Sequence, residues 1–267
     1  MVKLGVNTVL FKAHPLAAAA AAIKKCGYHG LEFSAIEGMC EHLNLNNWRS
    51  QKAEILAILE ETGLLPLSTE VASMDKERLM KAFEACAELG IPIVNIGPGG
   101  TAGDDASLEE SLEKINILAE MARPFGVTLC VKAHVGNAVH NTPTTLKMME
   151  AVQNPAFGVD MDPSHIYRAG ELPEVALPAV ISRVKHIHIR DCKGPGPSPG
   201  EPELQACGRG DINLYDYFKA MVDANYSGPV CLEVIGRELD MTEASIIAAE
   251  SYGYMNACLK MITGGTQ

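Results

Sequence analysis

Two hydrophobic patterns alternate along the chain. Short apolar runs rich in β-branched residues are typical of strands, and each is followed by a longer amphipathic or apolar stretch that is typical of a helix. The predicted strands lie at residues 3–11, 29–35, 64–71, 91–100, 126–136, 157–165, 184–191 and 229–234. The predicted helices lie at residues 15–27, 46–63, 75–90, 107–126, 142–152, 172–184, 212–226 and 242–262. The repeating unit is therefore a strand followed by a helix.

Eight such units at roughly even spacing predict one fold class. Strand–helix units form right-handed parallel crossovers, and eight of them close into a (β/α)8 TIM barrel. We expect a single α/β domain over residues 1–267, a length that such barrels commonly fill. The alternative is an open, doubly wound sheet, but neither terminal run, 2–10 or 229–236, has the charges of a protected edge strand. In a barrel, the chemistry lies at the carboxyl ends of the strands.

Composition and charge narrow the classes of partner. A hydrophobic share of 47% with 21% charged residues is enough to build a large core. Because 22 Lys and Arg face 33 Asp and Glu, the net charge of −11 repels polyanions. A nucleic-acid partner is therefore not expected. The sequence leaves open whether the chain forms a homo-oligomer or takes a small partner subunit.

The cysteines and the apolar runs indicate where in the cell the protein is expected. Eight cysteines are scattered without a C-x-x-C pair, which favours reduced thiols in a cytoplasmic protein. The alanine-rich run at 17–22 is cut short by Lys24 and Lys25, far below the ~20 apolar residues that span a bilayer. No signal-peptide pattern opens the chain. We therefore expect no membrane association.

Carboxylates and imidazoles gather near the ends of the last three predicted strands. They are Asp162, His165, His188, Asp191 and Glu233. If these strands are parallel neighbours, the side chains converge at one rim of the sheet. Carboxylate oxygens mixed with imidazole nitrogens are typical ligands of Mn²⁺, Zn²⁺, Co²⁺ or Mg²⁺. An ion-pair network at the sheet edge is the alternative.

Strand alternation suggests which of these groups act together. Asp160 and Asp162 point to the same side, so Asp162 at the strand end is the better ligand and Asp160 its support. His165 on the following turn could bind metal, contact substrate or serve the turn. His188 shares one face of its strand with Arg190. Glu233 lies in an apolar run, where a buried carboxylate is costly unless it meets a cation.

Four motifs give these residues a family resemblance. They are D-P-S-H at 162–165, H-x-H-x-x-D at 186–191, G-R-G-D-I at 208–212 and N-Y-S-G-P-V-x-L-E at 225–233. This set resembles the xylose-isomerase-like (β/α)8 superfamily of sugar isomerases, epimerases and AP-endonuclease-type enzymes. The motifs are specific in the C-terminal half, whereas the N-terminal half shares only the strand–helix rhythm.

The resemblance implies a divalent-metal site. In that family a Glu ending strand five, an Asp, a His and a Glu hold the ion, and the last three match Asp162, His188 and Glu233. The family's histidine two residues after the strand-five Glu matches His134. This chain has Lys132 in place of that Glu, and a charged ammonium has no lone pair for a metal. Three accounts stay open: other ligands such as Glu70 or His134 retain the metal, Lys132 replaces its charge, or Lys132 is a neutral base or Schiff-base amine.

The implied activity is metal-dependent isomerisation or epimerisation of a sugar or keto-sugar by proton abstraction next to a carbonyl. The expected catalytic residues are Glu233, Lys132 and His134. The expected substrate-binding residues are His165, Glu70 and Arg190. A lyase acting on a 3-keto-glycoside or an inositol derivative is the main alternative, because the lost Glu favours altered chemistry. A metal-free binding barrel comes next, and an AP-endonuclease-like phosphodiesterase last.

Two glycine-rich loops follow predicted strands. The loop at 97–103 lacks P-loop spacing, so an ordinary loop is favoured over a phosphate cradle. The loop at 192–210 is long enough to cover the site, and its prolines would limit its motion.

Overall fold

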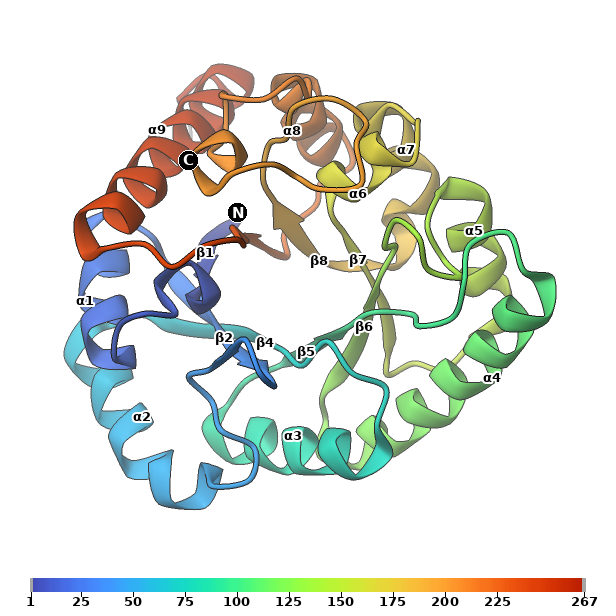
Figure 1. Cartoon of the computed structure of the whole chain (residues 1–267), viewed down its shortest axis with the longest axis horizontal. Coiled ribbons are helices and arrows are strands. Elements are labelled where there is room, and N and C mark those ends of the chain that lie inside the picture. Colours follow the sequence, from blue (N-terminus) through green and yellow to red (C-terminus); the bar gives the residue numbers. More distant parts are fainter. Residues whose placement is uncertain (1, 266–267) are drawn as a thin grey trace.

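Nine strands in one sheet form the centre of the molecule, and the helices surround them (Figure 1). The computed structural model describes residues 2–265. The strands are β1 (Lys3–Asn7), β2 (Gly30–Ile36), β3 (Cys40–Glu41), β4 (Leu65–Glu70), β5 (Ile93–Ile96), β6 (Thr128–Lys132), β7 (Phe157–Met161), β8 (Val184–Ile189) and β9 (Pro229–Leu232). That the domain fills residues 1–267 from end to end stays a prediction, because residues 1, 266 and 267 lie outside the described part.

The sheet is a closed barrel. Strand β1 pairs in parallel with β9, where Leu4 faces Val230, and with β2, where Gly5 faces Gly30. The remaining order, β9-β8-β7-β6-β5-β4-β2, is parallel throughout, and β3 alone adds to β2 in an antiparallel direction. This confirms the predicted (β/α)8 barrel and excludes the open sheet.

Glycines on β1 and β2 permit this closure. A Cβ on Gly5 would lie 2.5 Å from Leu67 Cδ1, and one on Gly30 would lie 2.4 Å from the Leu65 carbonyl oxygen. The Gly30 position needs glycine because the close atom belongs to the backbone, whereas at Gly5 the close atom is the end of a side chain, which a larger residue would displace. The first two strands therefore pack tightly at the amino-terminal end of the barrel.

The helices form the outer layer. They are α1 (Leu16–Lys25), α2 (Trp48–Thr62), α3 (Lys76–Leu89), α4 (Asp105–Ala122), α5 (Thr142–Ala151), α6 (Pro163–Arg168), α7 (Pro173–Val180), α8 (Leu214–Asp223) and α9 (Met241–Thr263). Short 3-10 helices are η1 (Thr8–Phe11), η2 (Arg123–Phe125), η3 (Ile181–Arg183) and η4 (Pro202–Gln205). Within residues 2–265, none of the helices has both the length and the apolar character needed to cross a bilayer.

Several predicted strands end earlier than expected, and in two of them a capping side chain is the reason. The first stops at Asn7, whose side chain accepts a hydrogen bond from the Val9 amide and begins η1. The sixth stops at Met161, because Asp162 caps α6 and Pro163 occupies its first turn. In both places a capping side chain overrides the β-rich pattern.

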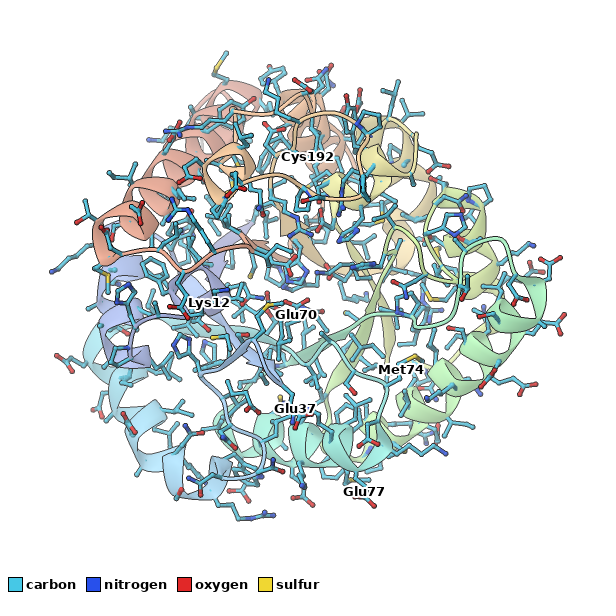
Figure 2. The ribbon with its side chains drawn as sticks, in the orientation of Figure 1. Lys12, Glu37, Glu70, Met74, Glu77 and Cys192 are labelled. Atoms are coloured by element: carbon cyan, nitrogen blue, oxygen red, sulfur yellow. The ribbon has the colours of Figure 1, made fainter. Side chains whose placement is uncertain are left out.

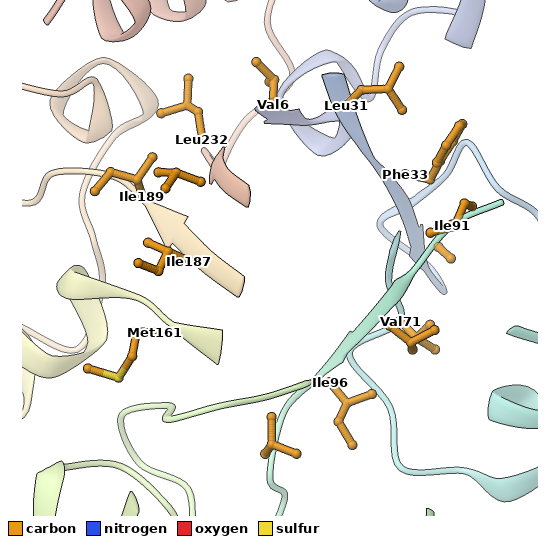
Figure 3. Packing of buried hydrophobic residues seen from close by; sticks show 14 of the residues in the cluster. Val6, Leu31, Phe33, Val71, Ile91, Ile96, Met161, Ile187, Ile189 and Leu232 are labelled. Carbon is orange, nitrogen blue, oxygen red and sulfur yellow. The ribbon is translucent and has the colours of Figure 1, made fainter. Parts of the chain in front are cut away.

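Alternation divides the strand side chains between two environments. Polar groups from the strands fill the inside of the barrel, and Glu70 among them lies near its centre (Figure 2). Apolar side chains such as Phe33, Ile187 and Ile189 lie on the other side of the strands and pack in the layer beneath the helices (Figure 3). The hydrophobic core is therefore a ring around a polar interior. All eight cysteines are free.

Candidate functional site

A cavity of about 680 Å³ opens at the carboxyl ends of the strands. Its lining includes six residues predicted as site residues: Glu70, Lys132, His134, His165, Arg190 and Glu233. Glu70 and Lys132 are the last residues of their strands, and Arg190 and Glu233 directly follow theirs. The parallel barrel thus brings together side chains that are far apart in sequence.

Lys132 joins two carboxylates on the cavity floor. Its Nζ lies 3.0 Å from Glu70 Oε1 and 2.8 Å from Glu233 Oε2. All three side chains are buried, and Asn7 Nδ2 donates to Glu70 Oε2 at 2.7 Å. The result is a bridged array, Glu70–Lys132–Glu233, that faces the cavity.

Arg190 makes a second link between carboxylates. Its Nη2 lies 2.9 Å from Asp162 Oδ2 and 3.5 Å from Glu233 Oε2. Its Nε donates to Ser164 Oγ at 2.8 Å, and the residue is only 1% exposed. Asp162 Oδ1 accepts from the amide and the hydroxyl of Ser164, at 2.8 and 2.7 Å. Both oxygens of Asp162 are therefore occupied by protein donors.

His188 lies deeper in the barrel than the cavity. Its Nδ1 is 2.6 Å from Asp160 Oδ2 and its Nε2 is 2.5 Å from Glu32 Oε2, so both nitrogens donate and the ring is an imidazolium. Burial disfavours this charge, but the two carboxylates outweigh it and raise the pKa of His188 well above its ordinary value. A doubly protonated ring has no lone pair for a metal.

The structure does not bring the predicted ligand set together. Asp162 and Glu233 are bridged by Arg190, whereas His188 pairs with Glu32 and Asp160. A guanidinium and an ammonium lie where the metal would bind, so the residues present do not fit a divalent cation there.

Other groups in residues 2–265 could hold a metal by distance alone. Their ligand atoms lie within 4.8 Å of one another, and they are Glu32–Glu70–His188, Asp160–His186–His188 and Glu32–His186–Cys231. Two of these groups contain the imidazolium of His188. In the third, burial raises the pKa of the Cys231 thiol well above its ordinary value, which disfavours the thiolate that metals prefer.

The two carboxylates on Lys132 differ in acidity. Burial, and next the charge of Glu233, raise the pKa of Glu70 to about 7 despite the opposing effect of Lys132. Burial also acts to raise the pKa of Glu233, but the charges of Lys132 and Arg190 prevail and lower it well below its ordinary value. The same two carboxylates outweigh burial and raise the pKa of Lys132, so it is charged at neutral pH. Glu70 is thus suited to proton transfer, and Glu233 remains an anion.

Two histidines form the wall above this floor. The His134 and His165 rings lie with centroids 4.0 Å apart, and Arg190 Nη2 lies 2.9 Å from His165 Nε2. Burial, with the positive charge of Arg190, lowers the pKa of His165 well below its ordinary value. Burial, with Lys132, lowers that of His134 too. Both rings are therefore neutral at neutral pH.

Arg168 connects this wall to the loop at 192–210. Its Nη2 lies 2.9 Å from His165 Nδ1, and its Nη1 donates to the Pro197 carbonyl at 2.8 Å. Pro197 and Pro199 line the cavity, as the expected cover would. Sequence reasoning missed Arg168, although its spacing of three from His165 in D-P-S-H-x-x-R could have signalled a neighbour.

Asp191 has a different role from the one expected at the rim. Its carboxylate accepts from the backbone amides of Cys192, Gly208 and Ile212, at 2.9, 3.0 and 3.1 Å. It thus fixes both ends of the loop at 192–210 and does not line the cavity. Cys192, at the start of this loop, is labelled in Figure 2.

Comparisons with known proteins agree with this architecture. A family model described as a xylose isomerase-like TIM barrel matches residues 20–258. An inosose dehydratase of Clostridium perfringens is 27% identical over 133 residues, which is 45% of this chain and 45% of that protein, so the match spans about half of the relative's length. The solved structure of an IOLI protein with a binding zinc atom has a TM-score of 0.80 at 17% identity and covers 98% of this chain and 99% of its own. A D-psicose 3-epimerase structure in the presence of D-fructose has a TM-score of 0.77 at 16% identity, covering 97% and 99%.

Proposed function

This chain belongs to the xylose isomerase-like TIM barrel family, and from that premise we propose that it is a lyase acting on a small polyhydroxylated ketone. The substrate class is a keto-sugar or a keto-inositol. The reaction removes a proton next to the carbonyl and then expels water from the neighbouring carbon.

The observation that carries this proposal is the buried array Glu70–Lys132–Glu233 on the cavity floor. Proton abstraction next to a carbonyl needs a base whose pKa is near the working pH, and Glu70 meets that condition. It also needs a fixed positive charge for the oxygen that becomes negative, and Lys132 supplies one. Glu233 holds that ammonium in place.

The bond changes balance without a co-reactant. Glu70 takes the proton, and the electrons of the C–H bond form the enolate. The enolate then expels the hydroxyl group of the next carbon, which takes the proton from Glu70 and leaves as water. The Glu70 carboxylate is regenerated, and the product is an unsaturated ketone.

Two observations favour loss of water over epimerisation. Epimerisation uses a pair of acid–base groups on opposite faces of the substrate. In this chain, one of the two positions expected to hold a carboxylate is occupied by the charged Lys132. The curated relatives are named inosose dehydratases, which supports the same choice. An isomerase or epimerase is the second candidate. Glu70 and Glu233 each accept their own hydrogen bond from Lys132, so Glu233 could serve as the second carboxylate.

Proton abstraction and its outcome can be followed by NMR in D₂O. The purified protein is incubated with an inosose and with a panel of ketohexoses. We expect loss of the hydrogen next to the carbonyl and formation of an unsaturated ketone that absorbs in the ultraviolet, with deuterium at that carbon in the substrate that is recovered. Deuterium with an epimer and no water loss would favour the second candidate. Neither deuterium nor an unsaturated ketone with any compound would contradict both candidates and leave a binding barrel.

The setting of the reaction belongs to the same proposal. The proposed location of the protein is the cytoplasm, and the eight free cysteines support it. The proposed substrate is a small molecule and not a nucleic acid, because the net charge of −11 repels polyanions.

A further inference from the structure

We infer that Lys132 and Arg190 together form an oxyanion site that takes the place of a divalent metal. The inference rests on the proposed function, since it names the groups that hold the substrate's carbonyl oxygen as it becomes negative. It assigns to Arg190 a role at the reacting atoms as well as in substrate binding.

Arg190 has a donor that the protein does not use. Two contacts hold the guanidinium in place: Nε donates to Ser164 Oγ and Nη2 donates to Asp162 Oδ2. Its Nη1 is buried and, in the part of the chain that the structure describes, meets no acceptor. A buried guanidinium N–H without a partner is costly, so the site is built for an acceptor supplied from outside. Arg190 lines the cavity, so a substrate that binds there meets a guanidinium with one N–H group that the described part of the chain leaves free.

Lys132 has a spare donor on the same floor. An ammonium has three N–H groups, and Glu70 and Glu233 accept two of them. Within residues 2–265, no further acceptor contacts Nζ. Lys132 Nζ and Arg190 Nη2 both reach the same atom, Glu233 Oε2, at 2.8 and 3.5 Å, so the two cationic groups lie beside one another at the cavity.

The charges match those of the ion they would replace. Two monovalent cations supply the charge of one divalent metal, and Asp162 and Glu233 neutralise them as they would a metal. A divalent ion added between them would meet strong repulsion at these distances. The site therefore polarises a carbonyl oxygen by hydrogen bonding and fixed charge, which is the usual work of an oxyanion hole.

The wild-type protein provides the first test. It is dialysed against a chelator, its metal content is measured, and it is titrated by calorimetry with oxalate, a planar dianion that resembles an enediolate. We expect stoichiometric oxalate binding by the metal-depleted protein. In a separate titration with MnCl₂ alone, we expect no stoichiometric binding.

A variant pair locates the binding. Arg190→Gln should weaken oxalate affinity about tenfold or more, the loss expected for a charge-assisted hydrogen bond. The matched control is Arg49→Gln, an exposed arginine on α2 that pairs with Glu84 and should leave the affinity unchanged. Circular dichroism checks that both variants are folded.

Four results would overturn the inference. The first two are that the metal-depleted wild type does not bind oxalate, or binds it only when metal is added. The third is that the wild type binds one equivalent of Mn²⁺ and Glu233→Gln does not. The fourth is that folded Arg190→Gln binds oxalate with unchanged affinity. This inference and the proposed function can fail separately. Deuterium exchange that needs added metal would overturn the inference but would leave proton abstraction, and with it the proposed function, in place.

Discussion

Lys132 has a structural and a chemical role at the same time. Replacing it with Met removes the cation between two buried carboxylates and leaves both without their partner. Breaking a buried pair from one side typically costs about 3–5 kcal/mol, so we expect Lys132→Met to lose stability of that order as well as activity. Urea unfolding measures the change. The double variant Lys132→Met/Glu70→Gln should recover part of it.

The matched control is Lys52→Met on α2. Lys52 pairs with Glu88 at the surface, where solvent screens the charges, and its removal should change stability little. If Lys132→Met is as stable as this control, the buried array does not exist as described.

Glu70 sets the expected pH dependence. Its pKa is raised to about 7, mainly by burial, so the carboxylate that accepts the proton forms only as the pH rises through that value. The rate should therefore increase from pH 6 to 8 with a midpoint near 7, an expectation set by that pKa. Glu70→Gln should lower the rate by about 10²–10⁴-fold and abolish this limb. A pH–rate profile whose midpoint is unaltered in Glu70→Gln would assign the base elsewhere.

Sequence reasoning found the residues around the cavity but not their pairing. Alternation along the strand correctly predicts that His188 and Arg190 share one face. The alternation does not give the depth of each side chain inside the barrel, because each step of two residues moves further along the barrel axis. His188 therefore meets the carboxylates of the interior, while Arg190 reaches Asp162 and Glu233 at the cavity. Pairing across a barrel depends on register between strands, which the pattern along one strand does not contain.

The loop at 192–210 depends on a glycine at its end. A Cβ on Gly210 would lie 2.0 Å from Asp191 Oδ1 and 2.5 Å from the Cys192 amide nitrogen. Gly210→Ala should therefore displace the anchor, cost about 1–3 kcal/mol and speed limited proteolysis within the loop. Gly196→Ala in the same loop meets nothing within 4 Å and should behave as wild type. Equal cleavage rates for the two variants would show that Asp191 does not hold the loop.

The order of elements was predictable, but several boundaries were not. The strand–helix rhythm gives the eight units because a strand and a helix bury apolar groups with different periods. It missed α6, and the strands before η1 and α6 were too long, because Asn7 and Asp162 end them by capping the following turn. Capping depends on one side chain and its hydrogen bonds, which a periodic pattern does not register.

At the scale of the whole molecule, closure of the barrel creates the site. Glu70, Lys132 and Glu233 come from β4, β6 and the end of β9, and they meet only because β1 joins both ends of the sheet. Even spacing of the units predicted this closure. Closure alone does not decide whether the site takes a metal or, as we infer, the cations of Lys132 and Arg190.

The most direct measurement is the rate of deuterium exchange by metal-depleted protein. The protein is treated with chelator, its metal content is confirmed to be far below one equivalent, and an inosose is incubated with it in D₂O. The account predicts exchange next to the carbonyl at the same rate before and after depletion, with Glu70 as the base and Lys132 and Arg190 on the oxygen. Exchange that disappears on depletion and returns with Mn²⁺ or Zn²⁺ would contradict it.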